Sequence, residues 1–151
     1  MSELKIESIS DELRRHNVSP SYPRKRILEY LIQRHNHPTV NTIYDDLIDE
    51  IPSLSKTTIY NNLRLFVEKK LVEEITIEGN EKRYDLYNPE SHAHFRCISC
   101  GKLYDIRLDY ADPFNELKDF QVHNLSIHLN GVCPDCINTA SAAETNSTSR
   151  T

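Results

Sequence analysis

Apolar residues recur at helical spacing through the first half of the chain. Spacings of three and four residues between apolar positions are typical of amphipathic helices with one buried face. Pro23 suits a first helical turn, and Ser55 is a favourable N-cap. The pattern predicts helices over residues 4–16, 23–34, 41–50 and 55–70.

The pattern changes to alternation after the fourth helix. Residues 72–77 and 82–87 alternate between apolar and polar, and Gly79-Asn80 between them is a turn signal. Two helices joined by a tight turn and followed by a β-hairpin make a winged helix-turn-helix. Residues 1–87 are therefore predicted to be a winged-helix DNA-binding domain.

The fourth helix has a polar stripe beside its apolar one. Arginine and lysine can meet phosphates or guanine edges, asparagine can pair with adenine, and hydroxyls can bond phosphates. A solvated face of an ordinary surface helix explains the same stripe, so the helix alone leaves both interpretations open. The candidate DNA-binding residues are Lys56, Thr57, Tyr60, Asn61 and Arg64, with Lys82 and Arg83 near the hairpin tip.

The second half predicts a small α+β domain. Residues 88–94 are polar and contain a proline, so we interpret them as a hinge. The domain over 95–137 is small, which favours a metal staple and self-association. Residues 138–151 are small and polar without a pattern, which predicts a disordered tail. The expected elements are strands at 95–97 and 102–106, a helix at 113–120 and a strand at 122–130.

Composition narrows the possible partners. The chain of 151 residues carries 18 basic and 23 acidic groups, a net charge of −5 that argues weakly against nucleic acid. The acidic excess lies mostly after residue 83, however, which leaves room for a local basic face before it. No apolar run approaches the roughly 20 residues of a membrane span, and the first residues resemble neither a signal nor a transit peptide. We expect a cytoplasmic protein.

All four cysteines stand in two C-x-x-C pairs, Cys97 with Cys100 and Cys133 with Cys136. Two such turns can complete a thiolate tetrahedron around zinc. One alternative is a pair of disulfides, for which no secretory context exists. The other is a redox pair, which normally occurs once and opens a helix after a strand. We predict a structural Zn²⁺ with no open position for catalysis.

His92 and His94 are two residues apart, so in an extended segment both rings lie on one face. Both can then meet one ion. Two histidines are not a site by themselves, and a solvated polar pair is the alternative.

Taken together, these features resemble the ferric uptake regulator superfamily of repressors. The resemblance covers about residues 10–136 and implies a homodimer that binds double-stranded operator DNA. The family usually has T-P-Q-R before the second helix, where this chain has S-Y-P-R ending at Arg24, the implied phosphate contact. The matching segments are HPTVNTIYDDL at 37–47, SKTTIYNNL at 55–63, RYDLY at 83–87, HAHFRCISCGKLYD at 92–105 and GVCPDC at 131–136.

Within that family, the peroxide-sensing branch resembles this chain best. Iron-sensing relatives usually have glutamate where this chain has Asp105. The branch's regulatory site holds three histidines and two aspartates, and imidazole with carboxylate suits Fe²⁺ or Mn²⁺. His123 and His128 lie near a histidine position of some relatives but match neither. The ligands implied by resemblance are His37, Asp85, His92, His94 and Asp105.

The resemblance also implies a sensing mechanism. Iron with an accessible position reacts with hydrogen peroxide, and the oxidant formed attacks the ring of His37 or His92. The oxidised ring binds metal poorly, so the ion leaves and DNA is released. Manganese would hold the same shape without the reaction.

Three other functions fit parts of the sequence. A repressor of the same family could respond to iron or zinc availability without peroxide chemistry. A non-haem iron enzyme uses two histidines and one carboxylate, but no catalytic acid/base constellation is visible and we expect no enzyme. A zinc-ribbon interaction module would leave the helix-turn-helix and wing unexplained.

Overall fold

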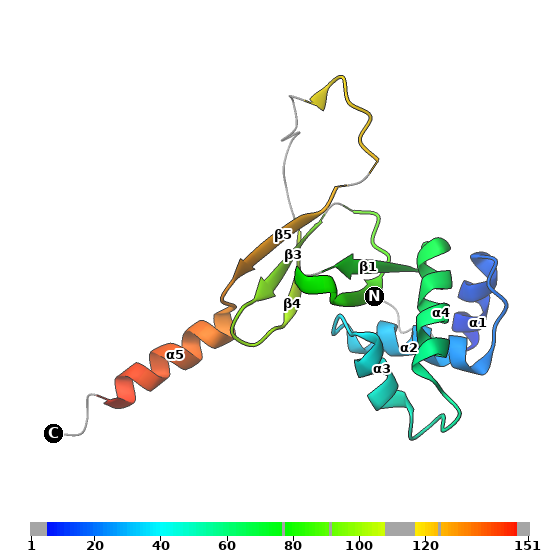
Figure 1. Ribbon diagram of the computed structural model, residues 1–151, viewed down its shortest axis with the longest axis horizontal. Coiled ribbons are helices and arrows are strands. Elements are labelled where there is room, and N and C mark those ends of the chain that lie inside the picture. Colours follow the sequence, from blue (N-terminus) through cyan, green and yellow to red (C-terminus); the bar gives the residue numbers. More distant parts are fainter. Residues whose placement is uncertain (1–5, 77, 91, 108–116, 124, 148–151) are drawn as a thin grey trace. The chain divides into compact units, whose positions relative to one another are not determined.

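The computed structural model describes residues 6–76, 78–90, 92–107, 117–123 and 125–147 (Figure 1). The chain forms two compact units, divided between Asn88 and Pro89, and each unit is described by itself. None of the helices in these described ranges is long and apolar enough to cross a membrane.

The first unit consists of helices followed by a hairpin, as the hydrophobic pattern predicts. Three helices begin at a hydroxyl side chain, Ser21, Thr39 or Ser55, that accepts a backbone N–H of the first turn. Such caps satisfy donors that have no partner within the helix. The elements are α1 (Ile6–Arg15), α2 (Tyr22–Arg34), α3 (Val40–Leu47), α4 (Lys56–Glu68), β1 (Val72–Thr76) and β2 (Lys82–Leu86).

The helix α3 ends at Leu47, three residues before the predicted end. The residues after Leu47 form a turn, in which the N–H groups of Glu50 and Ile51 both bond the Leu47 carbonyl. Ile51 and Leu54 in the following turn are buried and keep this connection against the core.

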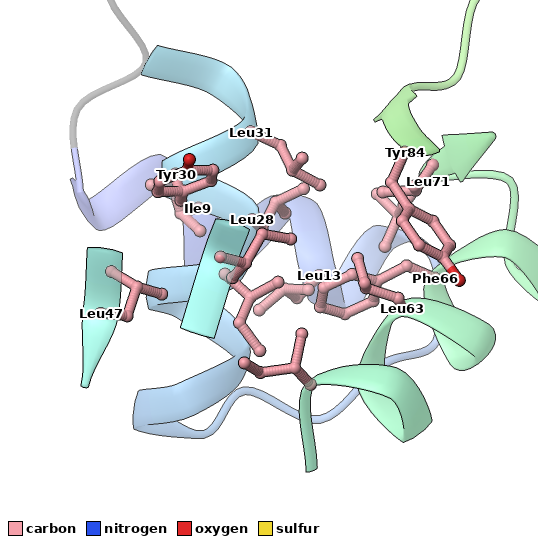
Figure 2. Packing of buried hydrophobic residues seen from close by; sticks show 14 of the residues in the cluster. Ile9, Leu13, Leu28, Tyr30, Leu31, Leu47, Leu63, Phe66, Leu71 and Tyr84 are labelled. Atoms are coloured by element: carbon pink, nitrogen blue, oxygen red, sulfur yellow. The ribbon is translucent and has the colours of Figure 1, made fainter. Parts of the chain in front are cut away.

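The apolar stripes of the helices meet in one core (Figure 2). Ile59, Leu63 and Phe66 of α4 are fully buried, and Leu13 of α1 and Leu28 of α2 belong to the same cluster. Burial of this stripe orients α4 and leaves its polar stripe facing outward.

Both strands of the hairpin pack against the helices. β1 and β2 pair antiparallel, and Gly79 at the turn adopts φ 78°, a left-handed conformation that glycine tolerates. The Tyr84 N–H donates to the Pro38 carbonyl at 3.0 Å, and the Tyr84 side chain is buried in the core. The loop before α3 is thereby held beside β2.

A three-stranded sheet forms the second unit, with β3 in the centre (Figure 1). β3 pairs antiparallel with β4 and parallel with β5. Alternate residues of a strand point to opposite faces, so His92 and His94 share one face, and Ala93 and Phe95 share the other. The elements are β3 (His92–Cys97), β4 (Leu103–Arg107), β5 (Ile127–Gly131) and α5 (Pro134–Ser147).

Two strand predictions were wrong at their boundaries. His92 and His94 were expected in the hinge, but they lie in β3 because β4 gives them partners, Arg107 and Asp105. The strand expected over 122–130 begins only at Ile127. Its pairing with β3 starts there, and the preceding described residues have no neighbouring strand.

The end of the second unit also differs from expectation. The tail predicted to lack structure is helical to Ser147, as the continuation of α5. The hydroxyls of Thr139 and Ser141 donate to carbonyls four residues earlier and so stay satisfied within the helix. The helix predicted over 113–120 lies largely outside the described residues, and at its end Phe120 N–H bonds the Leu117 carbonyl in a turn.

The core of the first unit gives a direct stability test. Leu63→Ala removes a fully buried side chain and is expected to lower the free energy of unfolding by about 2–5 kcal/mol. Arg64→Ala, on the exposed neighbouring position, is the control and should change it by about 0.5 kcal/mol or less. Urea unfolding followed by circular dichroism measures both. Equal midpoints for the two variants would contradict this view of α4.

Candidate metal centres

The four cysteine sulfurs lie around one point. Cys97 Sγ is 3.8 Å from Cys136 Sγ, and Cys100 Sγ is 3.8 Å from Cys133 Sγ. All four sulfurs lie within 4.8 Å of one another. Sulfurs bonded to a tetrahedral zinc at about 2.3 Å stand about 3.8 Å apart. The cluster therefore has the dimensions of a tetrahedral zinc site.

The turn after β3 and the start of α5 position these sulfurs. Cys97 ends β3, and the Gly101 N–H returns to the Cys97 carbonyl at 2.9 Å, with Gly101 at φ 74°. A side chain at that φ would be strained. Cys133 stands directly before α5, and Cys136 lies in its first turn, where the Ile137 N–H bonds the Cys133 carbonyl.

The thiols of the cluster differ in pKa. Backbone N–H groups of Cys100 and Cys133 lower the pKa of Cys97 to about 6, and a hydrogen bond from Tyr104 lowers the pKa of Cys133. The hydrogen bond with Cys133, together with burial, raises the pKa of Cys136 to about 12. Four thiolates together thus require a compensating cation, and a divalent metal ion supplies it.

The two alternatives to a metal site match this geometry less well. All four cysteines are free, and their 3.8 Å separations are nearly twice a disulfide bond length of about 2.05 Å. The pair Cys133 and Cys136 does open a helix after a strand, as a redox pair would. Its sulfurs, however, face those of the first pair.

A second donor group lies on β3 and β4. His92 Nε2 is 3.1 Å from His94 Nε2, which is 3.4 Å from Asp105 Oδ1. Neighbouring donors on one ion at about 2.1 Å stand roughly 3.0–3.4 Å apart. His92 Nδ1 donates to the Glu90 carbonyl at 2.8 Å, so Nε2 keeps its lone pair. A second nitrogen anchored to a carbonyl is common for metal-binding histidines.

The first unit contains its own donor pair, His37 and Asp85. His37 Nε2 is 3.2 Å from Asp85 Oδ2, and only 5% of His37 and 8% of Asp85 are exposed. The other Asp85 oxygen accepts the Leu86 N–H at 2.8 Å. His37 adopts φ 46°, a left-handed conformation that costs a non-glycine residue about 1–3 kcal/mol. Such strain persists where surrounding contacts enforce it, here the hydrogen bond between Tyr84 and Pro38.

The predicted regulatory ligands are thus found in two groups. His37 meets Asp85 in the first unit, and His94 meets both His92 and Asp105 in the second. Both groups combine imidazole with carboxylate, the donor set that suits Fe²⁺ and Mn²⁺.

The predicted polar stripe of α4 faces solvent. Its side chains are all exposed, and the Lys56 ammonium also lies 5.3 Å from the centre of the Tyr44 ring. The exposed residues of this stripe are Lys56, Thr57, Tyr60, Asn61 and Arg64.

Other predicted DNA contacts are engaged within the first unit. Arg24 donates to the Asn62 side chain at 3.1 Å and to the Ser19 carbonyl at 2.8 Å, which ties α2 to α4. Lys82 pairs with an acidic side chain at 3.0 Å on the facing strand. Arg83 lies 3.6 Å from Glu81. A DNA role for these three cations requires them to exchange or share these partners.

Sequence reasoning missed two side chains at the metal centres. Tyr104 donates a hydrogen bond to the Cys133 sulfur, which raises the pKa of Tyr104. Alternation along β4 could have placed the side chain of Tyr104 on the sheet face opposite that of Asp105. His128 stacks on His94, with ring centroids 5.9 Å apart. That contact depends on the β3–β5 register, for which the sequence contains no local signal.

Comparison with known proteins places these features in a family context. The model of the ferric uptake regulator family matches residues 15–130. The peroxide-responsive repressor PerR of Staphylococcus epidermidis is 36% identical over 142 residues, which cover 87% of this chain and 94% of that protein. PerR of Staphylococcus aureus strain USA300 is 36% identical over 144 residues, which cover 88% and 97%.

Solved structures show the same fold. The ferric uptake regulator of Vibrio cholerae aligns with a TM-score of 0.65 at 26% identity, over 82% of this chain and 98% of that one. PerR of Streptococcus pyogenes, described as a peroxide sensor and gene regulator, aligns with a TM-score of 0.50 at 30% identity, over 90% and 95%.

Removal of one thiolate tests the cysteine site. Cys100→Ser is expected to lose bound zinc and to lower the melting temperature, because three thiolates hold the ion less tightly. Ser99→Ala, next to it in the same turn, should retain one zinc per chain. Elemental analysis and thermal unfolding measure both variants. Full zinc content in Cys100→Ser would contradict the four-thiolate site.

Proposed function

Because this chain belongs to the ferric uptake regulator family, we propose that it is a metal-dependent transcriptional repressor that senses hydrogen peroxide. In this proposal the regulatory ion is Fe²⁺ or Mn²⁺, and the response to peroxide is the iron-catalysed oxidation of a ligand histidine. Zn²⁺ at the four cysteines has a structural role.

The observation that supports this proposal most is the presence of an imidazole–carboxylate group in each unit. His37 lies 3.2 Å from Asp85 in one unit, and His94 lies 3.4 Å from Asp105 in the other. Neither group contains a thiol, so both differ in metal preference from the cysteine cluster. In the proposed site, one ion is bound by ligands from both groups. It thereby couples the first unit, which carries the DNA-binding helix α4, to the sheet of the second unit.

The donor set balances the charge of a divalent ion. Asp85 and Asp105 contribute two negative charges, and His37, His92 and His94 bind as neutral imidazoles. Most of these side chains have little access to water: His37, Asp85 and His94 are each less than a tenth exposed. A net neutral site is favoured in such surroundings, because burial of an uncompensated charge is costly.

Peroxide sensing follows from the chemistry of one imidazole. Fe²⁺ held by these histidines and aspartates would supply the redox chemistry, and one ligand ring would take up one oxygen atom from hydrogen peroxide. Overall, one histidine and one peroxide give an oxohistidine and water. His37 and His92 are the proposed targets. An oxidised ring loses the nitrogen lone pair that binds the ion, so oxidised His37 or His92 no longer acts as a ligand.

DNA binding is assigned to the exposed stripe of α4. The stripe carries Lys56 and Arg64 for phosphates or guanine, and Asn61 for adenine. Operator half-sites one helical turn, or about 34 Å, apart require two reading helices at a set distance. Metal binding that fixes the reading unit therefore raises DNA affinity, and by linkage DNA raises metal affinity equally.

A homodimer supplies the second reading helix. The sheet face opposite the histidines bears apolar side chains, of which Ile106 and Leu129 remain 37% and 42% exposed. Burial of this face against a second copy would complete a core that the unit has little of. The small apolar core of the second unit therefore supports both a homodimer and the use of this sheet face as its interface.

The DNA assignment predicts a selective loss. Arg64→Ala is expected to weaken binding of the Mn²⁺-loaded protein to a duplex selected from a random pool by about tenfold or more. If Arg64 contacts a phosphate, the slope of log affinity against log salt should also fall by about one. Arg14→Ala removes the same charge from an exposed site on another helix, α1, and serves as control. Equal losses in both variants would show a general charge effect and refute the assignment.

The sensing mechanism predicts oxidation that depends on the metal. Protein loaded with Fe²⁺ or Mn²⁺ is treated with low peroxide, digested with trypsin and sequenced by mass spectrometry. Oxygen is expected on His37 or His92 with iron only, together with loss of DNA binding. The exposed His35 lies in the same tryptic peptide as His37 and should stay unmodified. Intact histidines with DNA binding retained would leave a repressor that responds to metal availability alone.

A further inference from the structure

Three residues form a row across the sheet of the second unit. His94 on the central strand pairs with Asp105 of β4 on one side and with His128 of β5 on the other. All three side chains lie on the face that carries His92. His94 is therefore flanked on both sides along the sheet.

The ring of His94 is contacted from several directions. Its Nε2 lies 3.1 Å from His92 Nε2 and 3.4 Å from Asp105 Oδ1. The His92 ring stands nearly perpendicular to it, at 81°. The His128 ring lies across from it at 5.9 Å between centroids, with the planes only 29° apart.

We propose that His128 is a positioning residue of the regulatory metal centre, whose ring stacks on His94 and keeps Nε2 of His94 directed at the ion. The proposal rests on the proposed function, because it takes His94 to be a ligand. Rotation of the His94 ring would carry Nε2 away from His92 and Asp105, and a stacked neighbour restricts that rotation. A metal-bound imidazole also gains positive charge, which the face of a neutral aromatic ring stabilises.

Stacking explains the geometry better than direct ligation by His128. The lone pair of an imidazole nitrogen lies in the plane of its ring. Two rings that bind one ion must direct those lone pairs at a single point. Among the described residues, His128 belongs to no group of donor atoms within 4.8 Å of one another, whereas His92 and His94 bring their nitrogens to 3.1 Å.

His128 is also suited to substitution without loss of the fold. Its side chain is exposed, and β5 is held by backbone pairing with β3. His123, in the segment before β5, is exposed too and lies outside the strands. Replacement of His123 is therefore a matched control for loss of a histidine.

The experiment compares Mn²⁺ binding by the full chain as wild type and as His128→Ala, His128→Phe, His123→Ala and His94→Ala. Free Mn²⁺ is measured by electron paramagnetic resonance, and Co²⁺ absorption reports the ligand geometry. His128→Ala should weaken Mn²⁺ binding by about tenfold or more, as expected for a residue that orients a ligand. His128→Phe, which keeps a stacking ring but has no nitrogen, should restore the affinity and the wild-type Co²⁺ spectrum. His123→Ala should bind as wild type.

Three other results would overturn the proposal. If His128→Phe binds as weakly as His128→Ala, the nitrogen of His128 is a ligand and the stacking role is wrong. Wild-type affinity in His128→Ala would make His128 a surface residue only. If His94→Ala itself binds Mn²⁺ normally, the proposed regulatory site fails rather than the role of His128. Zinc content and melting temperature, equal across variants, confirm that the fold is intact.

Discussion

The second unit depends on the cluster of four cysteine sulfurs, because it has almost no other buried core. Among its described residues, the buried hydrophobic side chains are Ala93, Cys97, Leu103 and Cys133. Two of these four are members of the sulfur cluster. A unit with so little apolar burial needs a metal staple, further association or both. Sulfurs of the first C-x-x-C pair lie 3.8 Å from sulfurs of the second pair, a separation that matches a shared zinc ion.

That closure also sets the position of the histidines. Cys97 ends β3, and the strand that it anchors carries His92 and His94 at its other end. The sulfur cluster and the histidine group are therefore rigidly related through one strand. Tyr104 and Asp105, adjacent on β4, reach the two centres from opposite faces of the sheet.

The first unit is built on a different principle. Its helices share a continuous apolar core, and this core is large enough to hold a strained residue in place. His37 keeps a left-handed backbone because the Pro38 carbonyl is bonded to Tyr84, whose side chain is itself buried. The stability of the helical core thus supports the donor pair His37 and Asp85. Strain of this kind is typical of sites where geometry matters more than local stability.

Local patterns determined much of this protein. Helical periodicity and the N-cap Ser55 indicated the helices, alternation around Gly79 indicated the hairpin, and the C-x-x-C spacing indicated the sulfur cluster. These signals suffice because each depends on residues close in sequence. The two donor pairs were indicated by resemblance to a family, since no spacing rule links His37 to Asp85.

The tertiary structure alone decided which distant residues meet. The parallel pairing of β3 with β5 joins residues more than thirty positions apart, and it brought His128 onto His94, which sequence reasoning had left without a role. It also shortened the strand expected over 122–130, since a strand extends only where a neighbour supplies hydrogen bonds. The register of a sheet is a global property of the fold, and so the residues that flank His94 could be read from the structure and not from the chain.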